Sequence, residues 1–433
     1  MRSPVTVVRT ARRSRYILAA LVAAGSAVLI TPQVAHAAAI SCNNTSLISA
    51  ITTANTTVGG GTVTLPTGCT FTLTAANNTV QGDNGLPVIT NNVTINGNGA
   101  TIKRASGAPN FRFFLVDNVA PGGNLTLNSL TLSNGVAPVT TEGHGGGAIM
   151  NRRRLTVTHV TFVNNVDLIP GSAGGGAIDN HDGGQATISK STFISNRAEE
   201  GGAVENEATQ AGAFLNISQS TFSNNTATKY GGGGVENQPG GNDALTADTF
   251  VGNTALEGGG IANGGTMTLT NSTLDNNTQK GNGGGGIQNY GAITIAQTTL
   301  SGNGGPGGGA NLHTYVPSGT SVITTVTQSI IANGVTSSNC SGSGAITDNG
   351  YNLDTGVSCG FSAANHSLSN TQPLLKALAS NGGPTQTMAL PAASPAVDAI
   401  PATVSGCSGS TDQRGVSRPQ GSGCDLGAYE RQG

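Results

Sequence analysis

The sequence predicts an all-β protein with the fold of a single-stranded right-handed parallel β-helix. Its repeats, its alternation of apolar and polar residues and its composition all indicate this fold. The 433 residues include 66 glycines but only 19 basic and 21 acidic side chains, which excludes coiled coils and charge-rich disordered chains. Between the repeats, apolar and polar residues alternate, as in Leu-Thr-Val-Thr at 155–158, and this period of two is typical of strands with one buried face.

Two motifs recur in a common register over residues 145–333. The first is a glycine run that ends in an apolar residue, a variable residue and asparagine, as in Gly-Gly-Gly-Ala-Ile-Asp-Asn at 174–180. The second is an apolar anchor followed three residues later by asparagine. Because the turns vary in length while the anchors keep their register, we expect coil to stack on coil with equivalent residues about 4.8 Å apart. The anchors are Phe162, Phe193, Phe222, Phe250, Leu274, Leu300 and Ile330.

Residues 1–37 are predicted to be a secretory signal peptide. Five arginines and no acidic residue precede an apolar run from Tyr16 to Ile30, and Ala35-His36-Ala37 has the small-residue pattern of a cleavage site. Removal of this segment leaves 14 basic and 21 acidic residues, a net charge of −7, which argues against nucleic acid as a partner. No later segment is apolar enough to span a membrane. We therefore expect a secreted protein whose mature chain has no transmembrane span.

The ends of the β-helix are predicted to be capped. Leu47, Ile51 and Ala54 follow helical spacing after the candidate N-caps Asn44 and Thr45. We interpret them as a short helix that covers the first coil, since the open end of a solenoid needs polar protection. The expected organisation is a signal peptide at 1–37, an N-terminal cap at 38–60, a β-helix at 61–335 and a C-terminal cap at 336–433.

The six cysteines fit an oxidising compartment outside the cytosol. Fifteen pairings are open to six cysteines, and their clustering favours the three local ones. We expect these bonds to fasten the two ends of the solenoid, where it frays. The predicted disulfides are Cys42–Cys69, Cys340–Cys359 and Cys407–Cys424.

The paired glycine and anchor motifs resemble the repeats of bacterial polymorphic outer-membrane proteins. The tail resembles the choice-of-anchor region found at the C-terminus of secreted bacterial β-helix proteins. These resemblances imply a secreted or cell-surface β-helix protein, with the pectate-lyase-like fold as the wider class, and they imply no particular activity. The matching tail segments are 381–385, 394–398, 411–415, 418–419 and 424–430.

One outward column of side chains is predicted to carry the chemistry. Strand alternation turns the residue before each motif asparagine away from the core, and in the middle coils this residue is a carboxylate. Glycosidases use two carboxyl groups about 5–5.5 Å apart when retaining and about 6.5–9.5 Å apart when inverting, and adjacent and alternate coils offer roughly these separations. The catalytic candidates are Asp179, Glu205, Glu236 and His181.

Three interpretations of this column stay open: a solvated face, a catalytic site and a calcium site, because hard cations accept clustered carboxylates. Apart from calcium, no cofactor is expected, and no C-x-x-C or other metal motif occurs. Polar and aromatic residues beside the column or in the adjoining turns are candidates for binding a substrate. They are Arg152, Glu207, Lys229, Tyr230 and Tyr290.

The sequence supports two functions. The first is non-catalytic binding, adhesion or shielding at a glycan-rich surface, favoured because no nucleophile elbow or catalytic triad is evident. The alternative is an extracellular polysaccharide lyase or glycosidase that uses the carboxylate column. In both cases the expected partner is an extracellular polysaccharide or a cell-surface glycan.

Overall fold

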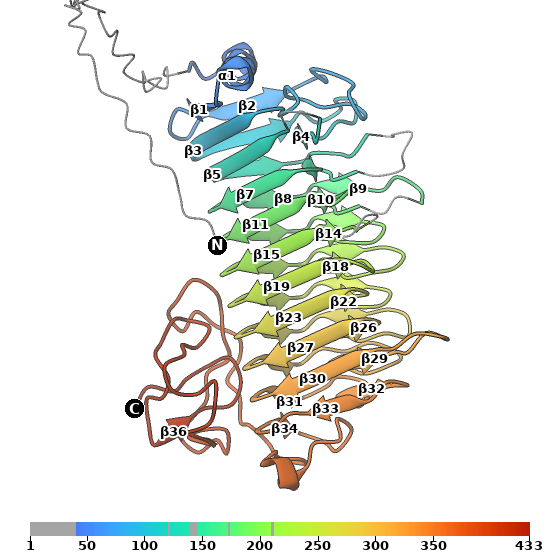
Figure 1. Cartoon of the computed structure of the whole chain (residues 1–433), viewed down its shortest axis with the longest axis vertical. Helices are drawn as coiled ribbons and strands as arrows, with labels where there is room; N and C mark the ends of the chain where they lie inside the picture. Colours follow the sequence, from blue (N-terminus) through green and yellow to red (C-terminus); the bar gives the residue numbers. More distant parts are fainter. Residues whose placement is uncertain (1–39, 120–121, 139–144, 172–173, 209–211) are drawn as a thin grey trace, which may run out of the picture. The chain divides into compact units, whose positions relative to one another are not determined.

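The computed structural model describes residues 40–433, apart from 120–121, 139–144, 172–173 and 209–211. The predicted signal peptide lies outside the described residues. Short strands stack coil on coil (Figure 1), and the pairings within the three sheets of the solenoid are parallel. The predicted all-β parallel β-helix is therefore confirmed.

Each middle coil runs through four short strands. One such coil consists of β10 (Ile178–Asn180), β11 (Gln185–Ser189), β12 (Thr192–Ile194) and β13 (Arg197–Ala198). Equivalent strands of successive coils pair, so β10 belongs to a nine-stranded sheet, β11 and β12 to a twenty-stranded sheet, and β13 to a five-stranded sheet.

The nine-stranded sheet carries the candidate site. It contains β10 with β4 (Phe114–Val116), β6 (Ile149–Asn151), β14 (Val204–Asn206), β18 (Val235–Asn237), β22 (Ile261–Asn263), β26 (Ile287–Asn289), β29 (Leu312–Thr314) and β32 (Cys340–Gly342). The five-stranded sheet contains β13 with β9 (Val166–Asp167), β17 (Thr226–Ala227), β21 (Thr254–Ala255) and β25 (Thr278–Gln279). The twenty-stranded sheet contains β11 and β12 with β1 (Gly61–Thr64), β2 (Thr70–Leu73), β3 (Asn92–Arg104), β5 (Asn124–Ser133), β7 (Arg154–Thr158), β8 (Thr161–Val163), β15 (Phe214–Ser218), β16 (Thr221–Ser223), β19 (Asn242–Thr246), β20 (Thr249–Val251), β23 (Thr266–Thr270), β24 (Thr273–Asp275), β27 (Ala292–Ala296), β28 (Thr299–Ser301), β30 (Ile323–Thr327), β31 (Ile330–Ala332), β33 (Ile346–Asp348) and β34 (Leu353–Asp354).

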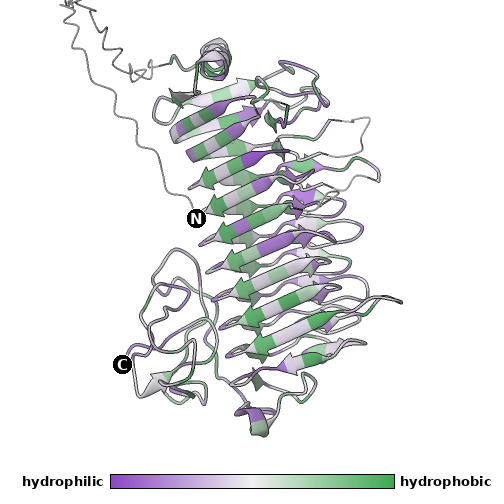
Figure 2. Ribbon diagram, in the orientation of Figure 1, coloured by the Kyte–Doolittle hydropathy of each residue, from purple (hydrophilic) through white to green (hydrophobic). Residues whose placement is uncertain are grey.

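The core confirms the predicted register. The rings of the four phenylalanine anchors stack with centroids 4.6–4.7 Å apart and planes within 5° of parallel. Beside them runs a ladder of buried asparagines: Nδ2 of Asn196 donates to the carbonyl of Phe162 and to Oδ1 of Asn225, both at 3.0 Å. Figure 2 shows the matching alternation of apolar and polar residues along the strands. Apolar stacking and asparagine pairing together fix each coil on the next.

A helix covers the first coil, as predicted. The helix α1 spans Asn44–Thr56, and its N-cap is Asn43, whose side chain accepts a hydrogen bond from the backbone of Ser46. The helix therefore begins slightly earlier than the candidate caps Asn44 and Thr45 suggest. Leu47 and Ile51 belong to the solenoid core. No helix in the described ranges has the length and hydropathy needed to cross a bilayer.

The C-terminal region begins with coils and ends with an irregular fold. The strands β32, β33 and β34 continue the parallel pairing, so the expected boundary at residue 335 falls inside the paired coils. A 3-10 turn at Ala363–Asn365 follows, and the tail then forms the short antiparallel pair β35 (Ile400–Pro401) and β36 (Gly423–Cys424). All three predicted disulfides are present.

Candidate functional site

The predicted carboxylate column lies on the nine-stranded sheet. Asp179 of β10 pairs with Glu205 of β14, which in turn pairs with Glu236 of β18, so the predicted alignment of the three carboxylates is confirmed. The apolar members of the same column, Met150 and Ala262, are buried but lie outside the apolar core cluster. The column therefore faces away from the core, as strand alternation predicts.

The predicted solvent exposure of this column is wrong. Asp179 and Glu205 are 0% exposed and Glu236 is 7% exposed. The segments leading into β14 and β18 fold back over Glu205 and Glu236. The backbone N–H of Gly201 donates to Oε2 of Glu205 at 3.3 Å, and at Gly231, with φ +72°, a Cβ would lie 2.7 Å from Oε2 of Glu236. Because glycine permits this close passage, loops cover the carboxylates, and the interpretation as a plain solvated face is wrong as well.

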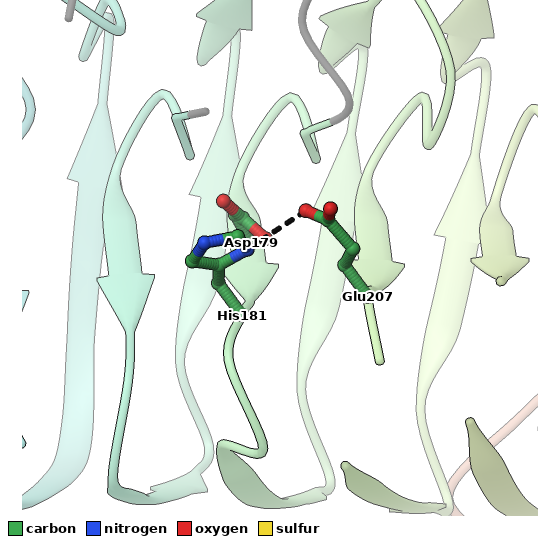
Figure 3. Close-up of side chains that lie close together, drawn as sticks. All are labelled: Asp179, His181 and Glu207. Carbon is green, nitrogen blue, oxygen red and sulfur yellow. Dashed lines mark hydrogen bonds and ion pairs between the residues drawn. The ribbon is translucent and has the colours of Figure 1, made fainter. Parts of the chain in front are cut away.

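Asp179, His181 and Glu207 form a compact buried cluster (Figure 3). One nitrogen or oxygen atom from each lies within 4.8 Å of the other two. Nδ1 of His181 is 2.7 Å from Oε2 of Glu207, and its Nε2 is 3.4 Å from Oδ2 of Asp182. Asp182 in turn forms a 2.7 Å ion pair with Arg152. Within the described part of the chain, neither carboxylate oxygen of Asp179 has a hydrogen-bond partner.

Burial and neighbouring negative charges raise the pKa values of the acidic residues in the carboxylate column. Burial raises the pKa of Asp179 well above its usual range, and the carboxylates of Glu207 and Glu205 raise it further. Burial likewise raises the pKa of Glu205 and of Glu236. The guanidinium of Arg112 opposes the rise at Asp179, while burial lowers the pKa of Arg112 itself to about 10. Ionisable groups so strongly perturbed concentrate at functional sites.

Aromatic side chains lie further along the same sheet. The rings of Tyr290 and Tyr315 meet edge to face with centroids 5.9 Å apart, and the ring of His313 stacks on Tyr315 at 6.4 Å. Tyr315 is 46% exposed, and burial together with the nearby carboxylate of Glu257 raises the pKa of Tyr290. We call Tyr290, His313 and Tyr315 the aromatic patch.

Two further predicted binding residues lie on loops. Nζ of Lys229 forms a 2.5 Å ion pair with Glu199, and Tyr230 is 58% exposed. The structure thus brings Asp179, His181 and Glu207 together in one cluster. Arg152 is linked to this cluster through Asp182, and Tyr290 belongs to the aromatic patch.

Sequence reasoning did not identify three residues of the site. The available signals were weak: a lone arginine among phenylalanines at 111–114, and a histidine that takes the column position of Gln288 in the next coil. The three residues are Arg112, Asp182 and His313.

The cluster is suited to two kinds of chemistry. A protonated Asp179 can donate a proton while the His181–Glu207 pair accepts one, which is the requirement of general acid–base catalysis. The same imidazole nitrogen and carboxylate oxygens are also the donor atoms of metal sites.

Strand pairing places the chain in the class of parallel β-helix proteins. Among solved structures, the chain is similar to pectate lyase Pel9A, with 16% sequence identity and a TM-score of 0.49, over 88% of this chain and 90% of that one. No protein-family model and no curated protein matches the sequence.

Proposed function

We propose that this protein is secreted and binds an extended polysaccharide, or the glycan of a cell surface, along the nine-stranded sheet. The observation that carries the proposal is a second column, placed one residue after the last residue of each strand, which is an asparagine in β6 to β26 and Thr314 in β29. The column changes from charged and polar side chains at one end to the aromatic patch at the other. Its members are Arg152, His181, Glu207, Gln238, Gly264, Tyr290 and Tyr315.

The regular spacing of this column suits a polymer. The backbone N–H of each member donates to the strand one coil earlier, as Glu207 does to the carbonyl of Asn180. The column therefore advances about 4.8 Å per coil and spans roughly 29 Å. A repeating ligand can contact the partly or fully exposed members of the column in successive coils, which are Gln238, Gly264, Tyr290 and Tyr315, whereas a small ligand would use only part of this stretch.

The charge of the site favours a neutral or amino-bearing glycan over a polyuronate. Glu200 and Glu257 border the column, and Nε2 of Gln238 donates to Glu200 at 2.7 Å and to Glu205 at 3.2 Å. Arg152, the cation of the column, is already paired with Asp182. Excess negative charge repels a polyanion.

Disulfides and the sequence resemblances support an extracellular location. Three disulfides are typical of chains that fold outside the cytosol. The resemblance of the repeats to polymorphic outer-membrane proteins and of the tail to choice-of-anchor regions favours a role at a cell surface.

Affinity electrophoresis of the mature protein in neutral, amino-bearing and uronate polysaccharides tests this function. We expect retardation in the first two, and we expect Tyr315→Ala to weaken binding up to about tenfold, because an aromatic contact contributes about 1.4 kcal/mol. Tyr351→Ala is the control, since Tyr351 stacks on His366 outside the nine-stranded sheet. Retardation in the uronate polymer alone, or an equal effect of both substitutions, would contradict the proposal.

Cleavage of a polysaccharide is the second candidate function. The His181–Glu207 pair beside the buried Asp179 favours it, because binding alone does not require these groups. Incubation with the same polymers tests it: new reducing ends would indicate a hydrolase, and unsaturated uronates would indicate a lyase. If no product forms with any polymer that the protein binds, the protein is a binding protein only.

A further inference from the structure

We propose that Asp179, His181 and Glu207 hold a divalent transition-metal ion, and that Zn²⁺ is the ion which suits them best. One imidazole nitrogen and two carboxylates are donors that zinc accepts, with water in the fourth position. His181 and Glu207 also belong to the second column, but this inference rests on the geometry of the buried cluster and not on polysaccharide binding.

The first argument is the position of the donor atoms. One atom from each residue already lies within 4.8 Å of the other two. Zinc binds nitrogen and oxygen at about 2.0–2.2 Å, so a tetrahedral site holds its donors about 3.4 Å apart. Closing the widest separation requires side-chain movement of up to about 1.4 Å. Asp179 and His181 flank Asn180, whose buried side chain is hydrogen-bonded to Asn151 and Asn206 in the neighbouring coils. Glu207, with its longer side chain, can therefore make the adjustment.

The second argument is the unsatisfied carboxylate of Asp179. The residue is 0% exposed, and neither of its oxygens has a hydrogen-bond partner among the described residues. Buried polar groups are normally paired, and a buried charge without a partner is costly. A cation between Asp179, His181 and Glu207 supplies the missing partner, and Figure 3 shows the three side chains converging on one region.

The third argument is the orientation of His181. Histidines that bind metals usually direct their other ring nitrogen to a carboxylate, which fixes the ring and its tautomer. Here Nδ1 faces Glu207, while Nε2 lies 3.4 Å from Oδ2 of Asp182, which Arg152 holds at 2.7 Å. When the metal binds to Nδ1 of His181, it takes the place of the proton between Nδ1 and Glu207. That proton is released to solvent.

The donor set distinguishes zinc from calcium. Calcium takes six to eight oxygen ligands, and the cluster provides two carboxylates and a nitrogen. Calcium is one of the three interpretations that the sequence leaves open for the carboxylate column. The side chains that the fold brings together favour a softer ion.

Titration calorimetry and thermal unfolding of the tag-free, chelator-treated mature protein test the site. We expect Zn²⁺ to bind with 1:1 stoichiometry and raise Tm, since a ligand bound only to the folded state stabilises it. Ca²⁺ and Mg²⁺ at the same concentration should not raise Tm. Asp179→Asn and His181→Gln should abolish the Zn²⁺ shift. The matched controls Glu199→Gln, which removes the carboxylate paired with Lys229, and His313→Gln, in the aromatic patch, should retain it.

A measurement on the wild-type protein tests the site even if the substituted variants fail to fold. Co²⁺ in the wild-type protein should give the visible absorption of a four- or five-coordinate site with a nitrogen ligand. Absence of Zn²⁺ binding, a Zn²⁺ shift that survives in His181→Gln, or stabilisation by Ca²⁺ in place of Zn²⁺ would each overturn the proposal. Polysaccharide binding is measured separately through Tyr315→Ala. A negative result for Zn²⁺ therefore does not contradict polysaccharide binding, and a negative result for polysaccharide binding does not contradict the Zn²⁺ site.

Discussion

Nδ2 of Asn206 donates a 2.6 Å hydrogen bond to Oδ1 of Asp243, inside the core of the solenoid. Asp243 stands where the neighbouring coils have Leu215 and Met267, and it is 1% exposed. Its Oδ2 has no hydrogen-bond partner among the described residues, and burial raises its pKa well above the usual range. The core therefore contains a carboxyl group that favours its neutral form.

This carboxyl makes stability fall as pH rises. Unfolded Asp243 loses its proton near pH 3.9, whereas the folded chain keeps it to higher pH. Between these two pKa values the folded state binds more protons, so the free energy of unfolding decreases with pH and levels off above the folded pKa. Asp243→Asn should remove this slope and be more stable than the wild type at pH 8, as measured by urea unfolding at pH 4.5 and pH 8.

Asp348 is the matched control for this prediction. Burial alone would raise the pKa of Asp348, but hydrogen bonds from Ser362, Asn352, Ser367 and Gly350 together outweigh burial and lower this pKa. Its contribution to stability is therefore present above the unfolded pKa and is lost as pH falls. Asp348→Asn should destabilise the protein at pH 8, the opposite of Asp243→Asn. Parallel pH profiles for the wild type and Asp243→Asn would contradict the interpretation of Asp243.

The phenylalanine stack should dominate the stability of the middle coils. Phe193 lies between Phe162 and Phe222, with centroids 4.7 and 4.6 Å away. Phe193→Ala should cost about 3–5 kcal/mol of unfolding free energy, because it removes a buried ring and leaves a cavity between two coils. Phe214→Ala is the control, since Phe214 is 37% exposed. A loss below about 1 kcal/mol in Phe193→Ala would show that this ring is not part of a close-packed core.

The asparagine ladder should be as sensitive as the aromatic stack. Nδ2 of Asn225 donates to the carbonyl of Phe193 at 3.0 Å and to Oδ1 of Asn253 at 2.9 Å. Asn225→Ala should destabilise the protein by about 3 kcal/mol or more, because each buried group left without a partner costs about 1–3 kcal/mol. Denaturant unfolding measures this loss. Asn276→Gly, at an exposed turn with φ 54°, should cost little, and equal losses in the two variants would contradict a special role for the ladder.

Local spacing was enough to predict the fold but only part of the site. The anchor at Phe193 and the asparagine at Asn225 recur at nearly constant spacing, so the sequence itself contains the register. Alternation also places Asp179 on the correct side of its strand. The exposure of Asp179 depends instead on how the loops fold back, and the cluster depends on the rotamers of His181 and Glu207 in adjacent coils. Neither leaves a periodic signal in the sequence.

Gln413 should hold the C-terminal tail on the solenoid. Its Nε2 donates to the carbonyl of Asp248 at 3.2 Å and to Oγ1 of Thr249 at 3.0 Å, and its Oε1 accepts from Oγ1 of Thr273 at 2.6 Å. Thr249 and Thr273 point out of the twenty-stranded sheet yet are 0% exposed, because the tail covers them. Gln413→Ala removes these hydrogen bonds and leaves buried groups without partners.

We therefore expect Gln413→Ala to make the tail susceptible to limited proteolysis while the coils stay protected, since cleavage follows the population of the opened state. Mass spectrometry of a digestion time course should show cuts in residues 370–433 at least about tenfold faster than in the wild type, which corresponds to a loss of about 1.4 kcal/mol. Gln420→Ala, an exposed glutamine of the same tail, is the control. Equal cleavage rates for Gln413→Ala and Gln420→Ala would mean that the disulfide Cys407–Cys424 and the apolar contacts of the tail hold it in place without Gln413.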